Sequence, residues 1–103
     1  MKRFTPTEMA RMKETLYIGL ARGDIDVREA TWRMRKILGM SQKDYARKVV
    51  GISPRILSQF ENGSGNPTLA TLEKIASPFG LKVTFLAPEA WRMKGKEEDS
   101  SQV

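Results

Sequence analysis

The sequence predicts an all-α fold that ends in one short strand, and three observations lead to this prediction. Serine, threonine or aspartate stands just before each of several apolar stretches of helical period, where it would cap a helix. Glycines follow these stretches, as they do at helix ends. Only Leu81–Leu86 alternates apolar and polar residues in the manner of a strand.

Composition limits the chemistry of this 103-residue chain, which has the length of one domain. Cysteine and histidine are absent, which excludes disulfides, thiolate metal sites and the commonest general base. No apolar run approaches the ~18 residues of a membrane span, and the N-terminus lacks a secretory signal. We therefore expect a cytoplasmic protein that is not an enzyme, needs no cofactor or metal, and has no membrane partner.

The net charge of +6 is concentrated in the first half of the chain. Residues 1–50 carry 12 lysines and arginines against 6 acidic residues, whereas residues 51–103 carry 6 of each. A one-sided basic charge favours a polyanionic partner, usually nucleic acid, although a solvated basic surface gives the same composition.

Two helices are expected before residue 40. Thr5, Pro6 and Glu8 form a capping box with proline at the first helical position, and Gly23 ends this helix. Its apolar stripe contains Met9, Met12, Leu16 and Leu20. Asp26 caps the second helix, which Gly39 ends and whose stripe contains Val27, Ala30, Met34, Ile37 and Leu38. Trp32 lies off this stripe, and we expect it beneath the first helix.

A tight pair of short helices follows. Ser41 caps a helix from Gln42 to about Val49, and Gly51 marks a turn. Ser53 and Pro54 begin the next helix, which runs through Asn62. Ala46 is small enough for the two helices to cross closely, and Ile56, Leu57 and Phe60 are expected to face inward. The residues left outward are polar or small: Ser53, Pro54, Arg55, Ser58, Gln59 and Asn62.

The remaining elements are a loop, a helix, a strand and a tail. Gly63 to Pro67 has strong turn chemistry. Thr68 caps a helix that ends at Pro78 and Gly80 and whose inward residues are Leu69, Leu72, Ile75 and Ala76. The strand Leu81–Leu86 follows, and the polar residues from Lys94 to Val103 are expected to be disordered.

Residues from about Ala30 to Phe79 resemble the Cro/C1-type (XRE) helix-turn-helix family. The strings that carry the resemblance are Gly39-Met40-Ser41-Gln42, Tyr45-Ala46, Gly51-Ile52-Ser53, Phe60-Glu61-Asn62-Gly63 and Asn66-Pro67-Thr68-Leu69. The resemblance implies a five-helix lambda-repressor-like DNA-binding domain, here with an added N-terminal helix and a C-terminal strand that pairs across a dimer. Residues 57–86 are most similar to HipB-like antitoxins and related small repressors.

The sequence departs from the family in one place. The stretch between Ala46 and Gly51 is one residue longer than the family pattern. Either the first helix of the pair bulges at its end or the turn is longer, and both alternatives affect the angle at which the second helix approaches DNA.

The resemblance implies a set of DNA contacts. Arg55, Ser58 and Gln59 would face base edges, where arginine suits guanine and glutamine suits adenine, and Pro54 would meet a thymine methyl group. Phosphate contacts would come from Gln42, Ser53, Asn62 and Asn66, with Lys43, Arg47 and Lys48 adding salt-dependent affinity. Glu61 is expected to be structural and to pair either with backbone groups or with an arginine such as Arg35.

A homodimer is expected because Leu81–Leu86 is a single strand. A lone strand leaves unpaired backbone groups along both edges, and pairing with a second copy would satisfy one edge and bury Leu81, Val83 and Phe85. The alternative is an extended segment packed on its own domain. The N-terminal helix would cover the core or the dimer seam, or would offer a surface to another protein.

These observations divide the chain into four parts: an N-terminal helical extension (1–26), a DNA-binding domain (27–80), a dimerisation strand (81–88) and a flexible tail (89–103). The expected function is sequence-specific repression from a palindromic double-stranded operator, with the protein associated with the nucleoid. Resemblance to HipB-like proteins implies an antitoxin and autorepressor with a cognate toxin partner. The alternatives are a phage or mobile-element regulator and a protein-interaction module that has lost DNA binding.

Overall fold

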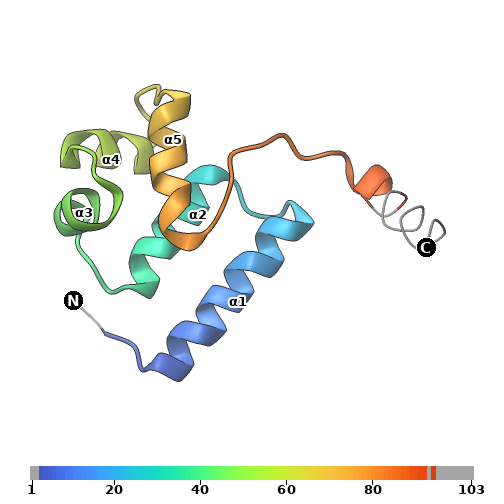
Figure 1. Ribbon diagram of the computed structural model, residues 1–103, viewed down its shortest axis with the longest axis horizontal. Coiled ribbons are helices and arrows are strands. Elements are labelled where there is room, and N and C mark those ends of the chain that lie inside the picture. The colour runs from blue at the N-terminus through green and yellow to red at the C-terminus, as the bar shows by residue number, and fades with distance from the viewer. Residues whose placement is uncertain (1–2, 93, 95–103) are drawn as a thin grey trace.

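A computed structural model describes residues 3–92 and residue 94. The helices are α1 (Pro6–Arg22), α2 (Val27–Ile37), α3 (Gln42–Asp44), the π-helix η1 (Tyr45–Val50), α4 (Pro54–Glu61), α5 (Leu69–Ala76) and the 3₁₀ helix η2 (Ser77–Phe79). The segments from α2 to η2 form a bundle, α1 runs diagonally along one side of it, and the chain then leaves as an extended arm (Figure 1). None of the described helices is long and apolar enough to cross a bilayer.

The predicted caps fix the helix boundaries. The Thr5 hydroxyl accepts from the Glu8 N–H at 3.1 Å while the Glu8 carboxylate accepts from the Thr5 N–H at 2.9 Å, which completes the capping box. Asp26, Ser41, Ser53 and Thr68 cap α2, α3, α4 and α5 in the same manner, each accepting from the N–H three residues later. The helix positions read from the sequence are therefore confirmed.

Helix α1 is part of the main core. Leu16 is fully buried in the same apolar cluster as Met34, Leu57 and Ile75, and burial of a leucine contributes about 1.5–3 kcal/mol. The Tyr17 hydroxyl donates to the Phe79 carbonyl at 2.6 Å and ties α1 to η2. Helix α1, which belongs to the predicted N-terminal extension, thus shares one core with the helices that follow it.

The extra residue before Gly51 forms a π-helical turn, so the first of the two predicted alternatives is correct. The Gly51 N–H donates to the Ala46 carbonyl five residues earlier at 2.7 Å, and the Ile52 N–H donates to the same oxygen at 3.0 Å. Gly51 has φ of 80°, a left-handed conformation that favours glycine. Ala46 is fully buried, as expected where α4 crosses η1. The added residue is absorbed within η1, and α4 begins at Pro54 as predicted.

Three apolar side chains that were expected to face inward are exposed. Val27, Ile56 and Leu69 have exposed fractions of 55%, 41% and 61%. Val27 and Leu69 are the first residues of α2 and α5. At the end of a helix, only the residues that follow can cover such a side chain. Trp32, expected beneath α1, lies beside Arg11, Met12 and Thr15 of that helix but is 46% exposed.

Residues 81–92 do not have the predicted structure of a strand followed by the start of a flexible tail. Within the described residues no strand is formed, and residues 81–88 are irregular and extended. Residues 89–92, predicted as the start of a flexible tail, form a helical turn, and the Arg92 guanidinium donates to the Arg22 carbonyl at 2.6 Å at the end of α1. Most of the tail predicted to be disordered, residues 95–103, lies outside the described residues.

Tyr45 carries a buried hydroxyl that has no hydrogen-bond partner within the described part of the chain. Burial, aided by the negative charge of Glu61 and opposed by Arg35, raises the pKa of Tyr45 from 10.0 to about 12. The unfolded chain therefore releases this proton at a lower pH than the folded protein does. Stability that is present below pH 10 is lost as the pH rises toward 12.

We expect the free energy of unfolding to fall by roughly 2 kcal/mol more in the wild type than in Tyr45→Phe between pH 10 and pH 12. At pH 7 the variant should be at least as stable as the wild type, because it no longer buries an unsatisfied hydroxyl. Urea unfolding at a series of pH values measures both effects. Parallel pH profiles for the two proteins would contradict the assignment.

Candidate nucleic-acid interface

Helix α4 has one face fixed in the core and the opposite face free. Leu57 is fully buried and Phe60 is 7% exposed, which sets the rotation of the helix. The predicted reading residues then lie on the remaining surface: Arg55 and Asn62 are exposed, and Pro54, Ser58 and Gln59 are half-buried. The structure thus brings the predicted base-contacting residues together on one helix.

Ile56 is the residue of α4 that sequence reasoning misplaced. It lies on the outward side, where it lines a small cavity of about 150 Å³ together with Gln59, Asn66 and Thr68. The sequence offered a signal, because Leu57 and Phe60 three residues apart already supply a complete inward stripe for so short a helix. An apolar side chain here is suited to contact with a thymine methyl group.

The loop after α4 is held against Gln59. The Ser64 N–H donates to the Gln59 carbonyl at 2.9 Å, and the Ser64 hydroxyl donates to the same oxygen at 3.3 Å. A Cβ atom at Gly65 would stand 3.3 Å from the Cβ atom of Gln59, so the loop backbone packs closely on this side chain. Asn66 is exposed beside it, and the loop extends the surface of α4.

An ion-pair network holds α2, α3 and α4 together. The guanidinium of Arg35 donates to both carboxylate oxygens of Glu61, with Nε–Oε2 at 3.0 Å and Nη2–Oε1 at 2.9 Å. Its Nη1 donates to the Met40 carbonyl at 3.1 Å, and the side-chain amide of Gln42 donates to Glu61 Oε1 at 3.0 Å. Of the two partners expected for Glu61, the structure shows the arginine, Arg35. The hydrogen bond between Gln42 and Glu61 was not predicted, and it occupies one of the two amide N–H groups that Gln42 offers to a phosphate.

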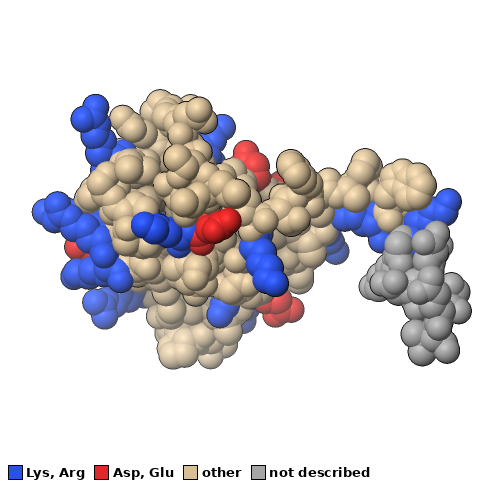
Figure 2. All heavy atoms as spheres, turned by 45° about the horizontal axis from the view of Figure 1, so that its top comes forward, with Lys and Arg blue, Asp and Glu red and all other residues tan. Residues whose placement is uncertain are grey.

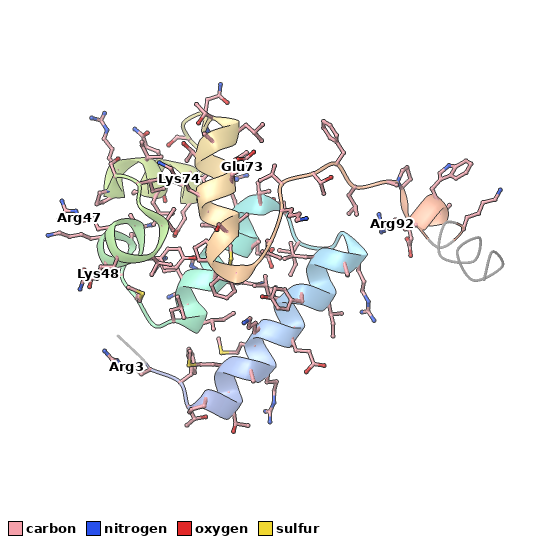
Figure 3. All side chains as sticks on the ribbon, viewed as in Figure 1. Arg3, Arg47, Lys48, Glu73, Lys74 and Arg92 are labelled. Atoms are coloured by element: carbon pink, nitrogen blue, oxygen red, sulfur yellow. The ribbon has the colours of Figure 1, made fainter. Side chains whose placement is uncertain are left out.

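Basic side chains surround this surface. Arg47 and Lys48 project outward from η1, away from the body of the molecule (Figure 3), and Lys43 is exposed on α3. Lys48 stands 3.9 Å from Asp44, but both side chains are more than half exposed, so this pair is weak and the cation remains available. On the side of the molecule where α3 and α4 lie, lysine and arginine side chains outnumber acidic ones (Figure 2).

The predicted dimerisation residues are not brought together in the single chain. Leu81 and Val83 are half-buried and line an apolar groove of about 450 Å³ that also involves Leu20, Ile25 and Leu72. Phe85, by contrast, is 100% exposed. The arm therefore packs on its own domain at its beginning and carries an uncovered aromatic side chain further on.

Comparison with known proteins supplies one match. The family model of the helix-turn-helix proteins matches residues 33–86, just over half of the chain. No curated protein and no solved structure matches the chain significantly.

Removal of Glu61 should be costly, because the side chains of Glu61 and Arg35 are only 5% and 11% exposed. We expect Glu61→Ala to lower the free energy of unfolding by about 3–5 kcal/mol, since it leaves a buried guanidinium without its counter-ion. The double variant Arg35→Met/Glu61→Leu should recover most of this loss. Urea unfolding measures each value.

Glu29→Ala is the matched control, because it breaks the partly exposed pair between Glu29 and Arg33 on α2. Its cost should stay within about 1 kcal/mol. If Glu61→Ala and Glu29→Ala lowered the free energy of unfolding equally, the Arg35–Glu61 pair would contribute no more to stability than an exposed ion pair.

Proposed function

Because the chain belongs to the Cro/C1-type helix-turn-helix family of DNA-binding regulators, we propose that it is a sequence-specific repressor. It occupies a palindromic operator and thereby blocks access to a promoter. It acts in the cytoplasm, where it is associated with the nucleoid. It acts by occupancy, without catalysis and without a cofactor. The observation that carries the proposal is the free face of α4, which presents Arg55 and Gln59 while Leu57 and Phe60 hold the helix in the core.

The major groove is where α4 reads the operator. Arg55 has two donors that match O6 and N7 of guanine, and the amide of Gln59 matches N6 and N7 of adenine. Ser58 lies between them as a shorter hydrogen-bonding group. Pro54 and Ile56 supply apolar contacts that suit thymine methyl groups.

Contacts to the DNA backbone fix the register of α4. Ser53 uses its hydroxyl oxygen to accept from the Ile56 N–H, which leaves the hydroxyl proton for a phosphate. Gln42 and Asn62 approach the backbone from α3 and the end of α4, and Asn66 approaches from the loop. Lys43, Arg47 and Lys48 add affinity that depends on salt but carries little sequence information.

A homodimer through the arm fits a palindromic operator. Two copies related by a two-fold axis place their α4 helices about one DNA turn, or ~34 Å, apart. Antiparallel pairing of Leu81–Leu86 with its own copy gives the arm the hydrogen-bond partners that an isolated strand lacks. The full exposure of Phe85 supports this arrangement, since a second copy would cover it together with Leu81 and Val83.

Within this function, the narrower proposal is an antitoxin that represses its own operon and binds a kinase-type toxin. Its basis is the resemblance of sequence motifs in residues 57–86 to those of HipB-like antitoxins. A phage or mobile-element regulator is the competing role, and a toxin reading frame beside the gene favours the antitoxin. A protein-interaction module without DNA binding is the other alternative, which the binding assay below separates from a repressor.

Arg55→Ala and Gln59→Ala should each weaken operator binding by about 1–3 kcal/mol and relax the preference at one base pair. The reason is that each variant removes hydrogen bonds to a base edge. Mobility-shift titrations with the promoter of the gene and with a scrambled duplex measure both affinity and preference. Lys48→Ala is the control, and it should weaken binding to both duplexes equally.

Two results would contradict different parts of the proposal. If the wild type does not prefer the promoter over the scrambled duplex at moderate salt, the repressor function is wrong. If the wild type shows a preference and Arg55→Ala retains it, only the assignment of base contacts is wrong.

Phe85→Ser should convert the dimer to a monomer, because it removes the exposed aromatic side chain from the proposed seam. Light scattering coupled to size-exclusion chromatography measures the mass. Thr84→Ser is the control, since it alters the neighbouring polar position and should remain dimeric. A monomeric wild type, or a Phe85→Ser variant that remains fully dimeric at low micromolar concentration, would argue against this interface.

A further inference from the structure

A polar cavity of about 400 Å³ lies where α2, the start of α3 and the end of α4 meet. Glu61 at the end of α4 and the following residue Asn62 line it, α3 contributes Gln42, and the first two turns of α2 contribute Arg28 and Trp32. Two of these residues, Gln42 and Asn62, are proposed above as phosphate contacts. Arg28 and Trp32 have no part in that proposal, and both precede the segment that matches the family model, which begins at residue 33.

The charges around this cavity do not balance internally. The carboxylate of Glu61 accepts hydrogen bonds from Arg35 and Gln42, and the carboxylate of Glu29 is paired with Arg33. Arg28 is exposed and forms no ion pair with any described residue. The acidic groups of the wall are thus already matched, and the guanidinium of Arg28 is a surplus positive charge that suits an anion.

The guanidinium of Arg28 lies against the backbone of the loop that follows α4. A Cβ atom at Gly63 would collide with Nη1 of Arg28, so the guanidinium lies directly against the residue after Asn62. Gly63 has φ of +82°, a left-handed conformation that favours glycine. Arg28 and Asn62 are therefore neighbours at the mouth of the same cavity, although they are far apart in the sequence.

We propose that this cavity binds one backbone phosphate of the operator and that Arg28 binds it together with Gln42 and Asn62. The inference rests on the proposed function and extends its DNA contacts from the helix-turn-helix pair to α2. Arginine presents a planar fork of N–H donors that matches phosphate oxygens, whereas the two amides supply single neutral donors. Trp32 is 46% exposed at the same cavity, so a bound DNA backbone changes its surroundings.

The test compares Arg28→Ala with Lys36→Ala. Both variants lose one positive charge from the exposed surface of α2, but Lys36 lies beside the cavity of Arg11 and Met12 and not beside this one. Binding to the promoter duplex is measured between 50 mM and 200 mM salt. For each bound copy, Arg28→Ala should reduce the slope of log affinity against log salt by about 0.9, and Lys36→Ala should leave it unchanged. Arg28→Lys should restore most of the slope because it keeps the charge.

Fluorescence supplies a second measurement. In a Trp91→Phe background, Trp32 is the remaining tryptophan, and addition of the promoter duplex should change its emission. Scrambled DNA should show the same loss of affinity in Arg28→Ala, since a phosphate contact is independent of sequence.

The outcomes separate this inference from the function on which it rests. A wild type that does not prefer its promoter overturns the repressor itself. A wild type that does, with equal salt slopes for Arg28→Ala and Lys36→Ala, overturns only the phosphate contact. A third outcome has two parts: inorganic phosphate changes the emission of Trp32 only when Arg28 is present, and Arg28→Ala leaves operator affinity and salt slope unchanged. This outcome would assign the cavity to a free anion and would also overturn the proposal.

Discussion

The buried pair between Arg35 and Glu61 is the constraint on which the arrangement of the interface depends. It joins the end of α2 to the end of α4 through two parallel hydrogen bonds, and the Met40 carbonyl and the Gln42 amide complete it. A buried charge without its partner is costly, so each member requires the others to be in place. The same contacts that stabilise the bundle also set where α3 and α4 meet the solvent. Stability and positioning of the proposed DNA surface are for this reason hard to separate in this protein.

The position of α4 depends further on how the chain absorbs one residue more than the family pattern. The π-helical turn of η1 places the extra residue before Gly51, where the Ala46 carbonyl accepts two N–H groups. Ala46 stays buried, and α4 still places Leu57 and Phe60 in the core. The irregularity is thus confined to one turn that begins at the fully buried Tyr45. A π-helical turn of this kind is frequent at functional sites, and here it lies next to the helix proposed to read DNA.

Helix α1 and the beginning of the C-terminal arm both pack against the core of the bundle. Leu16 and Tyr17 attach α1 to the core and to η2, and Arg92 attaches the arm to the end of α1. Between these two attachments lie an apolar groove and the uncovered side chain of Phe85. A single chain leaves this apolar surface in contact with water, which is unfavourable in proportion to its area. This part of the fold supports the proposal that the protein works as a dimer.

The sequence by itself determined the helices and their ends, because caps, glycines and apolar period act over three or four neighbouring residues. Thr5, Asp26, Ser41, Ser53 and Thr68 begin their helices as predicted, and the polar face of α4 followed from Leu57 and Phe60. The structure alone decided the features that depend on residues distant in the sequence. These include the choice of a π-helical turn over a longer turn, the exposure of Ile56 and Trp32, the hydrogen bond from Gln42 to Glu61, and the position of Arg28 against Gly63. Each depends on contacts between segments that are distant in the sequence, and local sequence patterns do not encode such contacts.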